Sequence, residues 1–146
     1  MKLELAICVA CGKTGCEVKR VNDSVVIQAV YSSKVKDRIK IQPGHMVAID
    51  IGSNPPEVVW RWIRATVIEV NDHVTIMDDM EGHPGVVSLV PELLLDLKLD
   101  DEVWVCGTGQ DYEVHGLILD GKPVDPDPIL RYITPIIEGI YQEERL

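Results

Sequence analysis

Short apolar runs, many of them alternating with polar residues, are separated along the chain by turns rich in Gly, Pro, Asn and Asp. This pattern predicts β-strands. The expected strands span residues 2–9, 16–21, 24–31, 34–41, 45–51, 58–70, 73–77, 86–90, 101–106 and 112–119. The clearest hairpin joins 58–70 to 73–77 through Asn71-Asp72, a pair that favours a turn. The chain is therefore expected to be mainly β.

The number and close spacing of these strands favour a small barrel or two packed antiparallel sheets. Ile41–Ile49 and Leu97–Val105 each place a polar turn between an apolar residue and a strand, which resembles the strand entries of small SH3-like barrels. A duplicated barrel would explain this likeness. Two ordinary hairpin entries would explain it too, and we prefer them because such turns are common. The expected β-rich domain covers residues 1–124, with two sub-barrels of about 1–90 and 91–124 as an alternative.

Residues 125–146 are expected to form a C-terminal helical segment packed on the outside of the β-rich domain. Asp127 can cap the helix, with Pro128 at its first position. Thr134-Pro135 repeats the same start signal, so the pattern predicts a kinked helix or two short ones. Its expected buried face consists of Ile133, Ile136, Ile137, Ile140 and Tyr141.

The composition predicts a packed core, and the lack of a membrane span or signal peptide predicts a reducing compartment. The chain has 146 residues, of which 46% are hydrophobic and none is Phe, so branched aliphatic side chains must fill the core. No stretch approaches the ~20 apolar residues of a membrane span, and the first residues lack the features of a signal peptide. We therefore expect a cytoplasmic protein, in which clustered cysteines serve metal binding or catalysis more often than disulfides.

Three of the four cysteines lie within nine residues, as Cys8-x-x-Cys11 followed by Cys16. Two cysteines at this spacing can ligate one zinc ion, and Cys16 can supply a third thiolate. A plain hairpin is the alternative. In that case Cys11 and Cys16 face each other across a four-residue Gly-Lys-Thr-Gly loop, and Cys8 is simply a small buried strand residue.

The segment Cys8–Cys16 resembles the first part of the retroviral-type zinc knuckle, a small nucleic-acid-binding element. In that resemblance Cys8 and Cys11 match two ligands, and Cys16 stands where the family has His. The match covers nine residues and fails at the fourth ligand, where this chain has Val21. We therefore expect a fourth ligand from elsewhere. Cys106 is the first choice, and the alternatives are His45, His73, His83 and His115.

Charge is distributed unevenly along the chain. Residues 1–64 carry a net charge of +4 and residues 65–146 carry −14, which gives −10 in total. A strand over 34–41 would place four cations on one face: Lys34, Lys36, Arg38 and Lys40. In this position they could follow a phosphate backbone. Trp60, Trp62 and Arg64 would share a face of the strand over 58–70 and could stack on bases. Edge-strand lysines and core tryptophans are the structural alternatives.

These observations rank three functions. The first is a non-catalytic binding or assembly protein with a zinc-stabilised N-terminal cysteine hairpin, acting on a protein partner or through self-association. The second is nucleic-acid binding through the basic N-terminal half, which the total charge of −10 opposes. The third is a thiol redox or metal-dependent enzyme. It ranks below a binding protein because no Ser/His/Asp, Cys/His or paired-carboxylate signature stands out. No membrane partner is expected.

Overall fold

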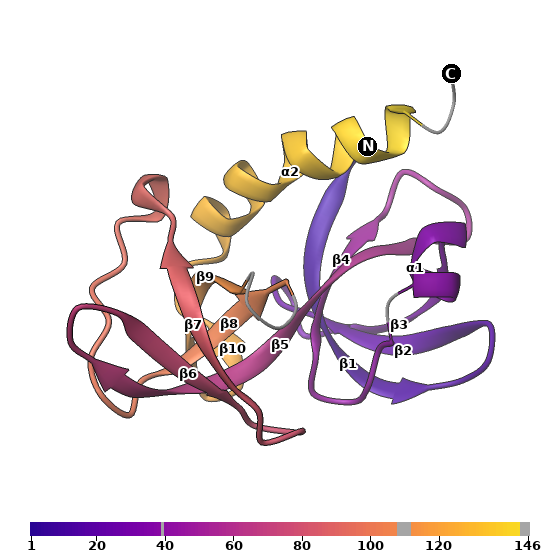
Figure 1. Ribbon diagram of the computed structural model, residues 1–146. Helices are drawn as coiled ribbons and strands as arrows, with labels where there is room; N and C mark the ends of the chain where they lie inside the picture. Colours follow the sequence, from indigo (N-terminus) through magenta and orange to yellow (C-terminus); the bar gives the residue numbers. More distant parts are fainter. Residues whose placement is uncertain (39, 108–111, 144–146) are drawn as a thin grey trace. The chain divides into compact units, whose positions relative to one another are not determined.

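The computed structural model describes residues 1–38, 40–107 and 112–143, without the side chains of residues 36–38 and 143. These residues form a mainly β structure with one long C-terminal helix (Figure 1). The strands are β1 (Leu3–Cys11), β2 (Gly15–Arg20), β3 (Val26–Tyr31), β4 (Met46–Asp50), β5 (Glu57–Val70), β6 (Val74–Asp78), β7 (Pro84–Leu89), β8 (Glu102–Cys106), β9 (Tyr112–Leu119) and β10 (Lys122–Pro123). The mainly β class and the C-terminal helix are therefore confirmed.

The chain divides into two compact units. Unit 1 consists of Met1–Arg61 with Leu130–Leu146, and unit 2 consists of Trp62–Ile129. The division falls inside β5 and inside the C-terminal helix, α2 (Pro126–Glu143). The predicted alternative boundary near residue 90 is not where the contacts divide the chain, and the assignment of residues 1–124 to a domain stays a prediction.

In unit 1 the strands form a ring of pairings. β1 pairs antiparallel with β2 and with β4, and β2 pairs antiparallel with β3. β5 closes the ring, because it pairs in parallel with β3 and also pairs with β4. Alternate residues point inward and form a core of small and branched side chains such as Ala6, Val18, Ala29, Val47 and Val58.

Unit 2 repeats the same pairing order. β5 pairs antiparallel with β6 and β8, and β6 pairs with β7. β9 closes this ring through a parallel pairing with β7 and an antiparallel pairing with β8. Its interior contains Ile63, Ala65, Ile76, Val103 and Val114. β5 is thus the last strand of the first ring and the first strand of the second.

The short helices also occupy equivalent positions. α1 (Ser33–Arg38) lies between β3 and β4, and the 3-10 turn η1 (Pro91–Leu93) lies between β7 and β8. The two similar sequence segments, Ile41–Ile49 and Leu97–Val105, each lead into the fourth strand of a ring. The sequence alone favours two ordinary hairpin entries. The repeated pairing order instead favours the duplicated arrangement.

Residues 33–38 form a helix, so the predicted strand over 34–41 is wrong. The Ser32 hydroxyl oxygen accepts a hydrogen bond from the Val35 backbone N–H at 3.3 Å, as an N-cap residue does. Successive residues of a helix are rotated by about 100°, so side chains two apart do not share a face. The strand face that would have aligned Lys34, Lys36 and Arg38 is therefore absent. The side chains of Lys36 and Arg38 are not among those that the structure describes.

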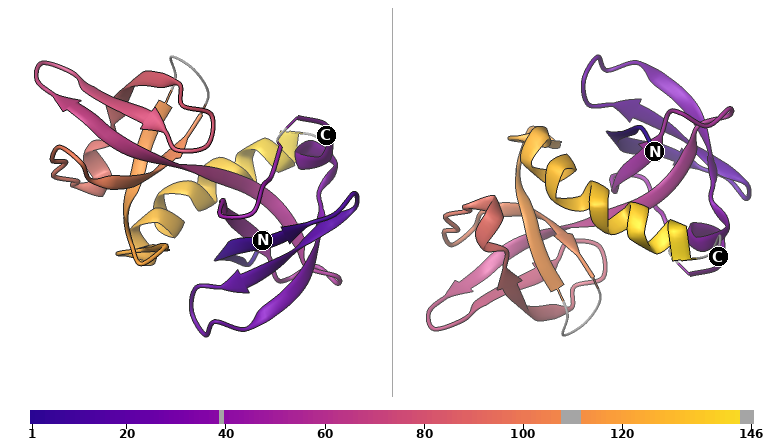
Figure 2. Two further views of the ribbon diagram at one scale, coloured as in Figure 1. Left: turned by 90° about the horizontal axis from the view of Figure 1, so that it is seen from below. Right: turned by 90° about the horizontal axis from the view of Figure 1, so that it is seen from above.

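α2 is one continuous helix that includes Pro135, so the predicted alternative of two short helices is wrong (Figure 2). It begins at Pro126, two residues before the expected first position. Its buried side chains recur every four residues, at Ile129, Ile133, Ile137 and Tyr141. In unit 1 the Tyr141 hydroxyl contacts Ser32 Oγ at 2.6 Å and donates to the Val59 carbonyl oxygen at 3.1 Å. No helix of the described residues is long and apolar enough to cross a membrane.

Unit 2 contains a buried polar pair. Trp62 Nε1 donates a hydrogen bond to Nδ1 of His115 at 2.9 Å, and both side chains are almost completely buried. Nε2 of His115 lies 3.3 Å from the Glu113 carboxylate. Burial lowers the pKa of His115, although Glu113 opposes part of this effect. The imidazole is therefore held neutral, since its Nδ1 accepts the tryptophan N–H.

This arrangement predicts a loss of stability in acid. Because the pKa of His115 is lower in the folded state, the unfolded chain binds the extra proton first as the pH falls below about 6.5. The free energy of unfolding should drop there, by up to about 1.4 kcal/mol per pH unit. Urea unfolding at several pH values from 7.5 down to 5 measures this. His115→Gln, which can still accept from Trp62, should flatten the slope; an unchanged slope would contradict the assignment.

Candidate binding groove and thiol cluster

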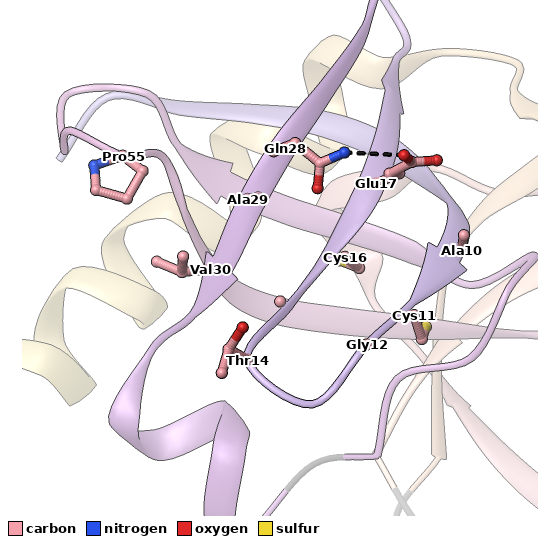
Figure 3. Close-up of a pocket in the computed structure, with 11 residues that line it drawn as sticks. Ala10, Cys11, Gly12, Thr14, Cys16, Glu17, Gln28, Ala29, Val30 and Pro55 are labelled. Carbon is pink, nitrogen blue, oxygen red and sulfur yellow. Dashed lines mark hydrogen bonds between the residues drawn. The ribbon is translucent and has the colours of Figure 1, made fainter.

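Unit 1 contains a groove of about 350 Å³ on its N-terminal strands. Figure 3 shows its lining residues, which come from four consecutive parts of the ring: the end of β1 with the β1–β2 hairpin loop, β2, β3, and Pro55 in the loop between β4 and β5. The volume is in the range of small-ligand pockets. The groove is therefore a candidate binding site formed by two loops, the end of β1, and the neighbouring strands β2 and β3.

The groove presents polar groups on a mostly apolar wall. Nε2 of Gln28 on β3 donates to the Glu17 carboxylate on β2 at 2.9 Å, and Thr14 lies in the hairpin loop at the groove's edge (Figure 3). These side chains offer both hydrogen-bond donors and acceptors to a ligand. Lys13, which is exposed, lies in the loop between the lining residues Gly12 and Thr14.

Backbone hydrogen bonds hold the hairpin loop in place. Gly12 N–H donates to the Gly15 carbonyl at 2.8 Å, and Tyr31 N–H donates to the Thr14 carbonyl at 3.0 Å. The Tyr31 hydroxyl also donates to the Gly12 carbonyl at 3.1 Å. The loop is thus attached to β3 by both the backbone and the side chain of Tyr31, which positions that end of the groove.

Gly15 permits a close approach of β2 to β3. A Cβ atom at this position would overlap the Ala29 carbonyl oxygen and would lie 2.9 Å from the Val30 Cα. Its position opposite Val30 in the antiparallel pair leaves no space for a side chain. The backbone φ of Gly15 is not in the left-handed region, so a residue with a side chain could adopt this conformation. Glycine is therefore required here for its lack of a side chain.

A β-bulge brings the three N-terminal cysteines to one side of the hairpin. The pairing of β1 with β2 shifts by one residue between Cys8 and Ala10. In a regular strand, residues three apart point to opposite faces; one extra residue restores the same face. Cys8 therefore points to the same side as Cys11, which pairs directly with Cys16 across the hairpin. The cross-strand pair expected for a plain hairpin is confirmed.

The three thiols interact with one another. Cys8 Sγ lies 3.2 Å from Cys11 Sγ, and the Cys11 thiol donates to the Ile41 carbonyl at 3.3 Å. Cys8 and Cys16 are buried, whereas Cys11 is exposed and lines the groove together with Cys16. A hydrogen bond with Cys16 raises the pKa of Cys8, and the same bond lowers the pKa of Cys16. Burial raises the pKa of Cys11 to about 11.

The remaining proposed ligands occupy different places. Cys106, at the end of β8, is half-buried and belongs to unit 2, so its role as a fourth ligand stays a prediction. His45 Nδ1 accepts the Gln42 N–H at 3.1 Å, and both nitrogens of His115 have partners. His73 and His83 are exposed in unit 2. Among the described residues, no three or more His, Cys, Asp and Glu side chains are arranged as a metal site.

The expected nucleic-acid contacts do not form one surface in the described side chains. Lys34 Nζ donates to the Ile140 carbonyl at 3.0 Å and lies over the Tyr141 ring, so it attaches α2 within unit 1. Lys40 is exposed and Trp60 is half-buried. Trp62 is completely buried against His115 and offers no face for base stacking.

Arg64 has partners in unit 2. Its guanidinium lies over the Trp104 ring and 3.8 Å from the Glu102 carboxylate. Its Nε, like Nε1 of Trp104, is buried and has no hydrogen-bond partner among the described residues. Sequence reasoning did not identify the groove, since Thr14, Gln28 and Pro55 have no recognisable motif. The part of its lining that the sequence did mark is the hairpin from Cys11 to Cys16.

Comparisons with known proteins return a distant structural likeness. No family model matches the chain, and no curated protein does. The chain is similar to a solved structure described as a multidomain protein with nucleic acid binding domains, from Streptococcus pneumoniae TIGR4. The TM-score is 0.31 at 10% sequence identity, and the match covers 91% of this chain and 57% of that one.

Proposed function

We propose that this chain is a non-catalytic binding protein whose ligand lies in the groove of unit 1. The observation that supports the proposal is the position of the groove, between the hairpin loop at Thr14 and the loop at Pro55, over β2 and β3. The loop carrying Thr14 is held by backbone bonds, so it is organised before a ligand arrives. The partner class expected from the sequence, a protein or a second copy of the chain, belongs to this proposal.

The proposal includes a zinc ion bound by the hairpin thiols. Cys8, Cys11 and Cys16 supply three soft ligands on one side of a bulged strand. Tetrahedral zinc with bonds of about 2.3 Å separates its sulfurs by about 3.8 Å. The Cys8–Cys11 pair, at 3.2 Å, would have to open slightly, and Cys11 would have to leave the Ile41 carbonyl. A bound ion would fix the part of the groove wall that Cys11 and Cys16 form.

Metal analysis tests this part. The purified protein should contain about one zinc per chain, and titration with cobalt should give thiolate charge-transfer absorption. Cys11→Ser should weaken metal binding by about 100-fold, because each thiolate supplies a large share of the binding free energy of such sites. Cys106→Ser decides the fourth ligand, since it weakens binding only if Cys106 coordinates. Protein with no stoichiometric metal, and no loss of stability with a chelator, would contradict zinc binding.

A single-stranded nucleic acid is the second candidate ligand, favoured by the strand order. The ring of unit 1, with its parallel closing pair and a helix before its fourth strand, resembles the OB-fold. That architecture binds oligonucleotides on its second and third strands and the adjoining loops. The groove lies at the corresponding β2, β3 and loops. Unit 1 has eleven Lys and Arg against nine Asp and Glu, whereas unit 2 has three against fifteen.

Fluorescence anisotropy with labelled single-stranded RNA and DNA tests this candidate. Binding should be micromolar or tighter at low salt and should weaken steeply as salt rises. Lys13→Glu, in the loop that borders the groove, should weaken it by about 10-fold. Lys98→Glu makes the same charge reversal on an exposed residue of unit 2 and should have little effect. Equal effects of the two variants, or no binding at low salt, would exclude the groove as a nucleic-acid site.

A further inference from the structure

We infer that Cys8 and Cys11 form a dithiol that a peroxide converts into an intramolecular disulfide. The inference concerns the metal-free protein and does not depend on the ligand of the groove. Three features of the hairpin support it: the direction of the two side chains, the distance between their sulfurs, and the exposure of one of them.

The direction of the side chains comes from the bulge. Without the register shift between Cys8 and Ala10, Cys8 and Cys11 would lie on opposite faces of β1 and could not reach each other. With it, both thiols point to the same side. Bulges often occur where a side chain must be redirected. The bulge therefore places two thiols that are three residues apart on the same side of one strand.

The distance is short for two unbonded sulfurs. Cys8 Sγ and Cys11 Sγ are 3.2 Å apart, and a disulfide bond is about 2.05 Å long. Closing the bond requires a movement of about 1.1 Å, which rotation of the exposed Cys11 side chain can supply. The backbone on both sides is already held, because Cys8 N–H donates to the His45 carbonyl and Gly12 N–H to the Gly15 carbonyl.

The exposure of Cys11 assigns the order of the steps. Cys11 faces the groove, so a peroxide reaches it first, while Cys8 is buried beneath it. The Cys11 sulfur attacks one peroxide oxygen as its thiol gives up the proton; the O–O bond breaks, the sulfur becomes a sulfenic acid, and the released hydroxide takes up that proton as water. The Cys8 sulfur then attacks the Cys11 sulfur, the S–O bond breaks, and a second water leaves with the Cys8 proton. Two thiols supply the two electrons that reduce one peroxide.

Oxidation should alter the groove. Cys11, with Ala10 and Gly12 beside it, forms one wall of the groove, so drawing its sulfur toward Cys8 changes that wall. The disulfide also removes two of the three thiols of the hairpin. A protein oxidised in this way should therefore be unable to take up a metal at this position until it is reduced.

The experiment uses chelator-treated full-length protein and one equivalent of hydrogen peroxide. Intact mass should show the loss of two hydrogen atoms, and peptide mapping should find Cys8 joined to Cys11. Cys106→Ser, which changes a cysteine of unit 2, should oxidise at the wild-type rate. Cys11→Ser, which changes an exposed residue and should fold normally, cannot form this disulfide, and with Cys8 buried it should show no loss of two hydrogen atoms under the same conditions. Far-ultraviolet circular dichroism checks the fold of each variant.

Several results would overturn the inference: a disulfide between Cys11 and Cys16, a bond between two chains, or oxidation of Cys11 that stops at a sulfinic acid. Metal content separates this inference from the zinc proposal. Protein that contains no zinc as purified but still forms the disulfide supports the dithiol and rejects the metal. Protein that binds zinc but forms no Cys8–Cys11 disulfide after chelation rejects the dithiol alone.

Discussion

Replacing Gly15 by alanine should cost unit 1 at least about 3 kcal/mol of unfolding free energy. The added methyl group would overlap the Ala29 carbonyl oxygen and would lie 2.9 Å from the Val30 Cα, and both are backbone atoms that cannot rotate away. β2 and β3 would have to separate at the groove. We therefore expect a lower midpoint of urea unfolding together with loss of ligand binding in the groove.

Gly12→Ala is the matched control for this prediction. Gly12 lies at the other end of the same hairpin loop, where a Cβ atom would be 3.4 Å from the Gly15 carbonyl oxygen. Its backbone φ is not in the left-handed region, so alanine causes no strain there. The cost should be below about 1 kcal/mol. Equal destabilisation by the two substitutions would show that the loop, and not the contact of β2 with β3, limits stability.

The second large effect is expected in α2. Ile137 is completely buried, whereas its neighbour Ile136 is 40% exposed. Ile137→Ala should cost about 3 kcal/mol through lost burial and the cavity that remains. Ile136→Ala removes the same atoms and should cost less than about 1 kcal/mol. Chemical unfolding of the two variants measures this difference. Equal costs at the two positions would mean that α2 buries both Ile136 and Ile137, as the sequence predicted.

Most strands could be predicted because their information is local. Alternation and turn residues located the strands from β1 to β9 within about two residues, and Asn71-Asp72 marked the β5–β6 turn. The helix at 33–38 was missed because four alternating cations and apolar residues imitate an edge strand. Ser32 acts as the N-cap of this helix. A serine alone is too common in sequences to predict a helix start.

The candidate site was only partly predictable. The cysteine spacing indicated that Cys8, Cys11 and Cys16 lie together, and the hairpin does place them on one side. It suggested a tight metal-binding turn, whereas Cys8 and Cys11 lie in a strand with a bulge between them. The position of a bulge depends on the pairing of two strands, which no spacing within one strand reveals. The groove depends in the same way on the ring, because Pro55 and Gln28 are far apart in sequence.

The discontinuity of unit 1 has a consequence for synthesis on the ribosome. Its strands emerge first, but Ile137 and Tyr141, which unit 1 buries, emerge last, and the bond from Tyr141 to Ser32 joins residues 109 positions apart. Unit 2, which is continuous, can complete its ring while the first unit still lacks its helix. The N-terminal half of this protein should therefore be the last to become resistant to proteases during translation, the reverse of the usual vectorial order.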